Sequence, residues 1–443
     1  MLCVEDTTFS IEIQGFAFQK TEFNPITQVS SFSFVSNSNT SEVVCPYCGA
    51  KAHIKGYNTT TLKDIPFIPG FGLEYMLEHH RYFCPHCGKT FTEKLNIQHS
   101  GTRVTKRAAI WIKLLLKVGL SITSVAKLTG IHWDTIRKIH LEFMENALTQ
   151  RLEEWKLTGY KPQYLAVDEF ALHRGHKYAT TVMDWETGEI IWVGKGRSMT
   201  DFMLFFEETD MEFLSEVKAV AMDMNAAYNR LVEVKLPKAE IVYDRYHMQA
   251  EFGRTVLGSV RLREAKEHKV KALELKELQK AETDAVKKAA LKAEIDSELA
   301  EYRQVKKARW LILTNNKNLE IPGQNMLQNI LDAHTDLSVC YAFKEEMGRL
   351  YDLTDPEEAR QGWLAWFSAA KASGIYELEK YAINKEKRLE GLIAHAKYAI
   401  STGKLEGMNN KIKVAKRVAY GFRDDHYFFT LIQFNSLASH KIP

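Results

Sequence analysis

The sequence has no uninterrupted apolar run of about 18 residues, the length that a membrane-spanning helix requires. It also has no N-terminal succession of basic, apolar and small residues of the kind that directs secretion. Both absences predict a cytoplasmic protein with no membrane partner. Its 443 residues, 45% of them hydrophobic, are enough for two to four globular domains with buried cores.

An excess of charge of either sign is also missing. The chain has 59 Lys and Arg residues against 56 Asp and Glu residues, which gives a formal net charge of +3. A strongly basic balance would have indicated a nucleic-acid partner directly. Because that balance is absent, any surface that binds DNA must be a local one.

Cysteine is scarce, since six residues in so long a chain exclude a disulfide scaffold. Four of them form two similar pairs, Cys45-Pro-Tyr-Cys48-Gly and Cys84-Pro-His-Cys87-Gly. Two such pairs surround one ion with four thiolates and leave no open position, which predicts a structural Zn²⁺ site. The alternative is a pair of redox or simply buried cysteine pairs, and the duplicated pattern argues against it.

The segment between the pairs, residues 49 to 83, is longer than the usual spacing of a small zinc ribbon, so a hairpin must bring the pairs together. Residues 1 to 40 alternate apolar and polar positions and predict short strands before this ribbon. Cys3 and Cys340 have no partner in the pattern and are expected to be inert, buried thiols. Possible substitutes for a zinc ligand are His53, His79, His80 and His86.

Residues 101 to 160 contain two predicted short helices joined at Gly130, the first capped by Ser121. This pattern is typical of a helix-turn-helix, and a plain helical hairpin explains it equally well. The adjacent zinc ribbon favours a DNA-binding unit. Its expected core is Val125, Leu128, Ile131 and Ile136, and the residues expected on the surface that faces DNA are His132, Trp133, Thr135, Arg137 and Lys138.

From residue 161 the period changes to that of strands alternating with helices, which predicts a mixed α/β sheet. Strands are expected at 164–170, 178–185, 189–193, 217–223 and 240–243, with helices at 200–206 and after Asn225. Two of the strands end in an aspartate, Asp168 and Asp223. A single aspartate in that position is usually a turn or cap residue. Two in one sheet are expected to lie side by side at its carboxyl edge, where open α/β sheets bind ligands.

Residues 261 to 310 contain neither Gly nor Pro and predict a long helical hairpin inserted into the sheet domain. We assign no chemistry to its charged surface. Trp310 and the cations Lys306, Lys307 and Arg309 suit contact with DNA, whereas a buried Trp310 that anchors the insertion is the favoured interpretation.

Residues 404 to 423 predict a helix with two unlike faces. Met408, Ile412, Ala415 and Ala419 form an apolar stripe, and Glu406, Asn410, Lys413 and Arg417 form a polar one. The ordinary interpretation is a solvated helix whose first-turn glutamate favours the helix dipole. The alternative is a helix that holds a metal ion through Glu406 and a DNA backbone through Lys413, Lys416 and Arg417.

Asp168, Asp223 and Glu406 together form the predicted catalytic set. Three carboxylates at one edge of a sheet suit Mg²⁺ or Mn²⁺, which keep positions open for water and phosphate oxygens. Two such ions activate the attacking hydroxyl and stabilise the leaving oxygen at phosphorus, which is the chemistry of nucleases and strand-transfer enzymes.

The order of motifs resembles bacterial insertion-sequence transposases of the ISL-three (ISL3) type over nearly the whole chain. The motifs are the two C-x-x-C pairs, V-D-E-F, R-G-H-K-Y-A, D-R-Y-H and L-E-G-M-N-N-K-I-K-V-A-K-R-V-A-Y-G-F-R. The resemblance implies an RNase H-like domain with a DDE triad at Asp168, Asp223 and Glu406. It also implies cleavage at the terminal inverted repeats, strand transfer to target DNA, and a homodimer or higher oligomer that holds the ends. In this family Asp244 and His247 belong to a recurrent motif, and we expect them to shape the site without direct ligation.

The resulting expectation is a multidomain α/β protein associated with the bacterial nucleoid. Its parts are strands and a zinc ribbon (1–100), a helix-turn-helix (101–160), an RNase H-like core in two pieces (161–258 and 396–443) and a helical insertion (259–395). Three other readings remain open. They are a DNA-binding regulator or domesticated transposase without catalysis, an RNase H-like nuclease that does not join strands, and a zinc-stabilised scaffold.

Overall fold

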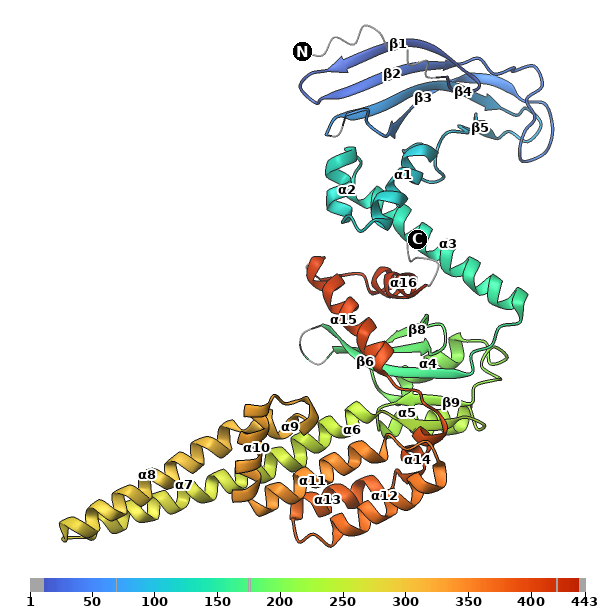
Figure 1. The fold of residues 1–443 in the computed structure, drawn as a ribbon. Helices are drawn as coiled ribbons and strands as arrows, with labels where there is room; N and C mark the ends of the chain where they lie inside the picture. Colours follow the sequence, from blue (N-terminus) through green and yellow to red (C-terminus); the bar gives the residue numbers. More distant parts are fainter. Residues whose placement is uncertain (1–11, 69, 174, 176, 420, 438–443) are drawn as a thin grey trace. The chain divides into compact units, whose positions relative to one another are not determined.

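The computed structural model describes residues 12–68, 70–173, 175, 177–419 and 421–437 (Figure 1). The chain forms two compact units, one built from the residues up to Glu154 together with Lys416–Asn435, the other from Trp155–Ala415. It passes between them within α3 (Trp133–Thr158) and α15 (Gly403–Val418). Over the described ranges, every helix is too short or too polar to cross a membrane.

The first unit begins with a five-stranded mixed sheet in the order β1-β2-β4-β3, with β5 paired to β4. β2 and β4 are parallel and the other pairs are antiparallel. Its buried core includes Phe34, Leu62 and Leu77. The strands are β1 (Phe16–Asn24), β2 (Val29–Ser36), β3 (His53–Asp64), β4 (Gly72–Phe83) and β5 (Thr90–Thr92).

The hairpin predicted between the two cysteine pairs is confirmed, because β3 and β4 are antiparallel neighbours that return the chain from one pair to the other. A buried carboxylate then joins this sheet to the helices that follow. Asp64 accepts hydrogen bonds from Thr105 Oγ1 (2.7 Å) and Arg107 Nη2 (2.6 Å), and Thr105 is also the N-cap of α1. Cys3 lies outside the described residues.

Three helices complete this part of the unit, α1 (Lys106–Lys117), α2 (Ile122–Thr129) and α3. Ser121 caps α2 through the Ser124 N–H, and Gly130 ends it in the left-handed region (φ 67°), as the sequence predicts. The prediction for Leu128 is wrong, since its side chain is 39% exposed. Three of the four predicted core residues, Val125, Ile131 and Ile136, are buried.

The second unit is organised around a mixed sheet of five strands in the order β10-β9-β6-β7-β8. β6, β7 and β8 form an antiparallel meander, and β9 and β10 continue the sheet in parallel from β6. The strands are β6 (Tyr164–His173), β7 (Lys177–Asp184), β8 (Ile190–Lys195), β9 (Ala219–Met222) and β10 (Glu240–Tyr243). β6 is longer than predicted, and Asp168 lies within it and not at its end.

Two helices pack on this sheet through aromatic side chains. α4 (Met199–Glu208) contributes Phe202, Phe205 and Phe206, and α5 (Ala226–Lys235) contributes Tyr228, to a core shared with the strands. Ser198 begins α4 with a capping box, in which the Asp201 carboxylate reciprocates the bond. Asn225 caps α5 and so sets the backbone directly after Asp223.

The insertion is helical, as predicted. α6 (Arg245–Phe252) continues through a π-helical segment at Gly253–Leu257 into α7 (Gly258–Ala281), and α8 (Ala285–Lys307) returns antiparallel to α7 (Figure 1). The favoured prediction for Trp310 is wrong, since this residue is 66% exposed and is not a buried anchor. Cys340 is buried, as expected. The remaining helices are α9 (Arg309–Leu313), α10 (Ile321–Ala333), α11 (Thr335–Leu350), α12 (Pro356–Lys371), α13 (Tyr376–Glu386) and α14 (Leu389–Lys397).

α15 and α16 (Asp425–Ser436) end the chain. Met408 and Ile412 of the predicted apolar stripe are buried, whereas Ala419 is exposed and does not extend that stripe. In the first unit, α16 packs on α3, where the Tyr427 hydroxyl and His140 Nδ1 are 2.6 Å apart and the rings of Phe143 and Phe434 are 5.3 Å apart.

Candidate active site

Asp168 and Asp223 are neighbours because β6 and β9 are paired in register. Tyr164, Leu165 and Ala166 of β6 lie opposite Ala219, Val220 and Ala221 of β9. Continued by two residues, this parallel register places Asp168 level with Asp223, which directly follows β9. The expectation that the two aspartates share one edge of the sheet is therefore met by the strand pairing.

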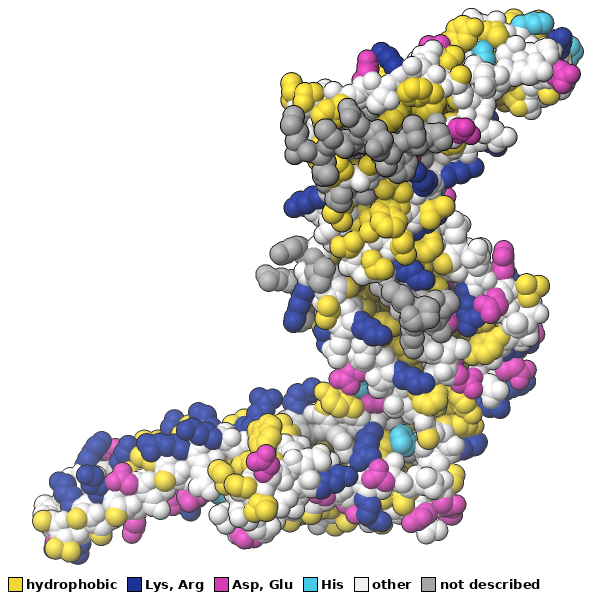
Figure 2. Space-filling model, turned by 45° about the horizontal axis from the view of Figure 1, so that its top comes forward, with side chains coloured by type: hydrophobic (Ala, Val, Ile, Leu, Met, Phe, Trp, Pro, Cys, Tyr) yellow, Lys and Arg dark blue, Asp and Glu magenta, His cyan; other side chains and the backbone are white. Residues whose placement is uncertain are grey.

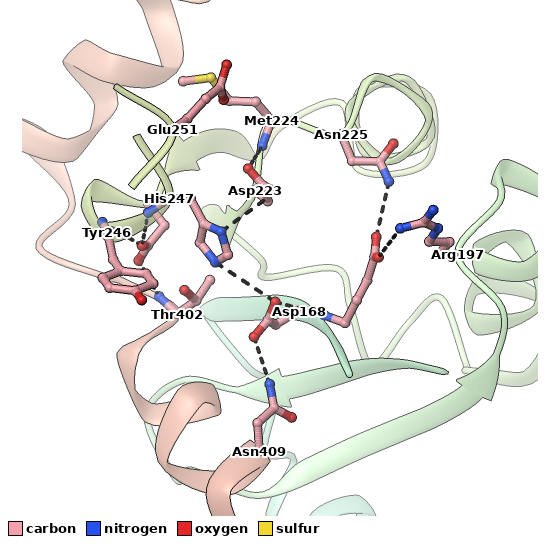
Figure 3. A network of polar contacts seen from close by, with 12 residues as sticks. Asp168, Arg197, Asp223, Met224, Asn225, Tyr246, His247, Glu251, Thr402 and Asn409 are labelled. Atoms are coloured by element: carbon pink, nitrogen blue, oxygen red, sulfur yellow. Dashed lines mark hydrogen bonds and ion pairs between the residues drawn. The ribbon is translucent and has the colours of Figure 1, made fainter. Parts of the chain in front are cut away.

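Both carboxylates are held by backbone N–H groups. Asp168 Oδ1 accepts from the Glu169 N–H at 2.8 Å, and Asp223 Oδ1 accepts from the Met224 N–H at 2.6 Å (Figure 3). Burial raises the pKa of Asp168 from 3.8 to about 6, although the Glu169 N–H opposes the shift. A cation bound beside Asp168 would favour the ionised carboxylate.

His247 lies between the two aspartates. Its Nε2 is 4.0 Å from Asp168 Oδ1 and its Nδ1 is 3.8 Å from Asp223 Oδ2 (Figure 3). The three side chains line an open hollow of about 190 Å³. The other residues that line it are Val167, Glu169, Tyr178 and Tyr228. His247 was predicted to shape the site, and its side chain is at the centre of it.

Glu169 is a site residue that the sequence analysis missed. Its Oε1 accepts from Asn225 Nδ2 at 3.2 Å, and Arg197 Nη1 is 4.0 Å from its Oε2 (Figure 3). Burial raises the pKa of Glu169. Arg197 also lies over the ring of Tyr178 at 4.1 Å. The V-D-E-F motif contained the signal, but strand alternation alone assigns Glu169 to the face opposite Asp168.

Asp244 joins the site to the start of α15. Its Oδ1 accepts from the N–H groups of Tyr246 and His247 and caps α6, while its Oδ2 accepts from the Thr402 N–H at 2.9 Å. Asp244 is buried. The Asp244 carboxylate thus fixes the backbone at two places. One is the start of α6, which carries His247, and the other is Thr402, whose carbonyl accepts the Glu406 N–H.

Asn409, one helical turn after Glu406, connects α15 to the aspartates. Its Nδ2 donates to Asp168 Oδ2 at 2.8 Å (Figure 3). Its Oδ1 is buried and, within the described chain, has no hydrogen-bond partner. This amide oxygen is therefore available as a ligand beside Asp168. The helical period did not single out Asn409, because it flanks the apolar stripe. Glu406 itself is exposed.

The three predicted acids do not form a closed ligand set. Among the residues that the structure describes, the four cysteines are the only group of three or more possible ligands whose atoms all lie within 4.8 Å of one another. Asp168 and Asp223 are separated by the imidazole of His247. The available donors are carboxylate and amide oxygens, which Mg²⁺ and Mn²⁺ prefer.

The cysteine cluster is formed by two matching knuckles in the first unit. In each, the N–H of the glycine after the second cysteine donates to the carbonyl of the first cysteine at 2.9 Å, and both glycines, Gly49 and Gly88, have positive φ. A side chain is strained in that conformation, which accounts for glycine at both positions.

The geometry of this cluster fits a tetrahedral zinc ion. The Sγ atoms of Cys45 and Cys87, and those of Cys48 and Cys84, are 3.6 Å apart. Sulfurs at about 2.3 Å from a tetrahedral ion are about 3.8 Å apart. A bond from the Cys87 backbone N–H lowers the pKa of Cys84 and so favours its thiolate, the form that binds metal. His79 and His80 are instead bonded to Thr60 and Glu93.

The surface predicted to contact DNA is partly engaged within the protein. Trp133 is exposed, as predicted, whereas Thr135 is half-buried, contrary to the prediction. The prediction of exposure is wrong for Arg137, which is half-buried, pairs with Asp424 and lies over the ring of Tyr427 at 4.9 Å. Lys138 is exposed and donates to the Gly101 carbonyl at 2.7 Å. On α15, Lys413 and Arg417 are exposed and Lys416 is half-buried.

Comparisons with known proteins agree on one class. A family model described as a transposase matches residues 165–432, a range that contains Asp168, Asp223 and Glu406. The chain is 32% identical over 422 residues to the transposase for insertion sequence element IS1001 of Bordetella parapertussis, across 95% of both proteins. It is 24% identical over 326 residues to the transposase for IS1557 of Mycobacterium tuberculosis, across 74% of this chain and 70% of that protein.

Proposed function

The chain belongs to the ISL3 family of insertion-sequence transposases, and from this premise we propose that it binds the terminal inverted repeats of its element and cleaves and joins DNA with a DDE triad. The triad is Asp168, Asp223 and Glu406. One observation carries the proposal. The register of β6 and β9 brings the two aspartates level, and Asn409, one turn after Glu406, bonds to the first of them.

We propose that the second unit is an RNase H-like core interrupted by the helical insertion. A three-stranded antiparallel meander extended by two parallel strands supports this assignment. The acids of such a core are at the edge where the parallel strands end, which is where an α/β sheet binds its ligand.

The residues around the triad have distinct roles in the proposed reaction. Asp168, Asp223 and Glu406 would hold Mg²⁺ or Mn²⁺, which would activate water or a 3′-hydroxyl and stabilise the leaving oxygen. Asn409 keeps the Asp168 carboxylate oriented. Asp244 fixes the first turn of α15, and His247 occupies the space between the aspartates and is suited to hold a phosphate oxygen.

The first unit would recognise the ends of the element. We propose that Cys45, Cys48, Cys84 and Cys87 bind a structural Zn²⁺, and that the helix-turn-helix of α2 and α3 enters the major groove. Trp133, Thr135 and Lys138 are candidates for DNA contact there. Arg137 would have to leave Asp424 to join them. Lys413, Lys416 and Arg417 of α15 are further candidates for the DNA backbone.

Two or more protomers would bring both ends of the element together on the bacterial nucleoid. The proposed reaction is tested with labelled end DNA and Mg²⁺, comparing the native chain with Asp223→Ala and with Glu207→Ala, which removes an exposed carboxylate of α4. We expect Asp223→Ala to bind DNA without cleaving it and Glu207→Ala to behave as the native protein.

The same assay separates the alternatives. Equal cleavage by Asp223→Ala and the native chain would contradict the assignment of the DDE triad. Binding without any cleavage by the native chain would indicate a DNA-binding regulator, and cleavage without joining of the freed 3′ end would indicate a nuclease.

A further inference from the structure

The hairpin of α7 and α8 has one side that attaches it to the rest of its unit. On this side, His334 precedes α11, and its Nδ1 is 2.8 Å from Glu264 Oε2 of α7 and its Nε2 4.0 Å from Glu301 Oε2 of α8. The Leu337 N–H donates to the same Glu264, and Arg263 pairs with Asp336. Two acidic residues of the hairpin, Glu264 and Glu301, therefore lie on the side that meets α11.

Another side of the hairpin is basic. At 3.6 residues per turn, one sector of α7 about 80° wide contains four lysines, and one sector of α8 about 60° wide contains four cations. All eight are exposed. They are Lys266, Lys269, Lys276 and Lys280 of α7 and Lys288, Lys292, Arg303 and Lys306 of α8.

The two sectors share one face, because the ring of Tyr302 lies between them. Lys269 of α7 is 5.8 Å from the centre of this ring, and Lys306 of α8 is 5.2 Å from it. Figure 2 shows Lys and Arg side chains gathered along one edge of this arm. Glu277, which bonds to Lys280, and Asp296 are the acids at the margin of the face.

We propose that this basic face of α7 and α8 binds the phosphate backbone of duplex DNA. The inference rests on the proposed function, which supplies DNA as the partner, and it adds a contact surface beyond the catalytic residues and the helix-turn-helix. The lysines of α7 extend from residue 266 to residue 280, about 21 Å at 1.5 Å per residue, or about six base pairs. Ammonium groups bind phosphate as point charges and do not read bases, so the contact is independent of sequence.

Segregation of charge distinguishes this face from an ordinary solvated one. A solvated helix usually mixes the signs so that neighbours three or four residues apart pair. Here the acids Glu264, Glu267, Glu274, Glu294 and Glu301 fall outside the basic sectors by the helical period. A row of like charges on one face suits a polyanion, whose bound counterions are released on contact.

The test uses the full-length protein and a labelled duplex of arbitrary sequence, with the dissociation constant measured by fluorescence anisotropy over a range of NaCl concentrations. The variant is Lys269→Gln with Lys276→Gln and Lys292→Gln. The matched control removes three exposed lysines outside the face, Lys271→Gln with Lys287→Gln and Lys317→Gln. Both lose three positive charges, and circular dichroism melting verifies that both are folded.

At about 0.9 per lost phosphate contact, we expect the slope of log Kd against log salt to be less steep by about 2 to 3 in the face variant and unchanged in the control. Arginine at the same three positions should restore the slope. Equal slopes in the face variant and the control would overturn the inference and leave the proposed function intact. Absence of salt-dependent binding by the native chain would overturn the proposed function and this inference with it.

Discussion

Asp168 carries its charge in a largely buried position, and this costs stability. Its pKa is about 6 in the folded protein against an ordinary value of 3.8. The folded state therefore holds this proton more tightly than the unfolded state does. Stability falls as pH rises from about 4 to about 6, and the full penalty remains above about 6. Such a cost is typical of a functional site, where a bound cation offsets it.

Replacing this charge should stabilise the metal-free protein. We expect Asp168→Asn to raise the free energy of unfolding of its unit at pH 7.5 by about 1–3 kcal/mol and to abolish cleavage. Addition of Mg²⁺ should stabilise the native protein and leave the variant unchanged. Glu207→Gln, the same chemical change at an exposed position, is the control for thermal melting. A variant no more stable than the native protein at pH 7.5 would contradict the buried-charge explanation.

Asn409 should act on the rate and not on DNA affinity. Without the bond from Asn409, the Asp168 carboxylate loses one of the hydrogen bonds that fix its orientation. We expect Asn409→Ala to lower kcat for end cleavage about 10- to 100-fold with little change in KM. Asn410→Ala, at the exposed neighbouring position, is the control. Equal rates for the two variants would mean that Asn409 has only a packing role.

Single residues were predictable from sequence where their role is local. Asp168 and Asp223 follow from strands that carry an acid, and Ser121 and Gly130 from helix capping. Asn409 was not, because its partner is far along the chain and periodicity only places it beside a buried stripe. Arg137 illustrates the same limit, since nothing near it in sequence indicates that Asp424 will neutralise it.

At the scale of elements, Asp244 connects α6 to α15. Its carboxylate satisfies N–H groups at the start of both helices. We expect Asp244→Ala to destabilise the second unit by about 2–4 kcal/mol and to reduce cleavage, because Glu406 lies in the first turn of the helix that Asp244 holds. Asp284→Ala removes an exposed N-cap at the tip of the insertion and should cost about 1 kcal/mol without affecting cleavage. Thermal melting and the cleavage assay measure both effects.

The cysteine knuckles are the second element with a measurable role. We expect Cys84→Ser to release zinc and weaken binding to end DNA, because the remaining three thiolates leave the tetrahedral site open. Cys340→Ser changes a buried thiol that burial holds in its neutral form, with its pKa raised to about 12, and should keep full zinc content. Zinc is measured by mass spectrometry of the purified protein. Unchanged zinc in Cys84→Ser would refute the four-thiolate site.

Most elements were predictable because their ends carry clear signals. β10 occupies Glu240–Tyr243, as predicted, and the β7–β8 hairpin turns at residues 185–189. The extension of β6 past Phe170 was missed, since pairing with β7 continues to His173 and no local sequence signal indicates it. The prediction for Trp310 was wrong because it relied on the general tendency of tryptophan to be buried. In this structure the buried side chains of the insertion include Val260, Val305 and Ile312.

At the scale of the whole molecule, both units are assembled from distant parts of the chain. The first unit includes Lys416–Asn435 in addition to its N-terminal part, and the proposed catalytic set joins residues of β6, the end of β9 and α15. The order of residues along the chain does not indicate which distant segments meet. The strand register and the bond from Asn409 to Asp168 show it. The account depends on one claim, that Asp168, Asp223 and Glu406 serve a common metal ion.

Localised cleavage of the polypeptide by bound iron tests that claim most directly. Fe²⁺ replaces Mg²⁺ at sites of carboxylate oxygens and, with ascorbate and peroxide, cuts the backbone next to its ligands. The account predicts cuts close to residues 168, 223 and 406 that excess Mg²⁺ suppresses together. Cuts near residues 168 and 223 with none near 406 would contradict it.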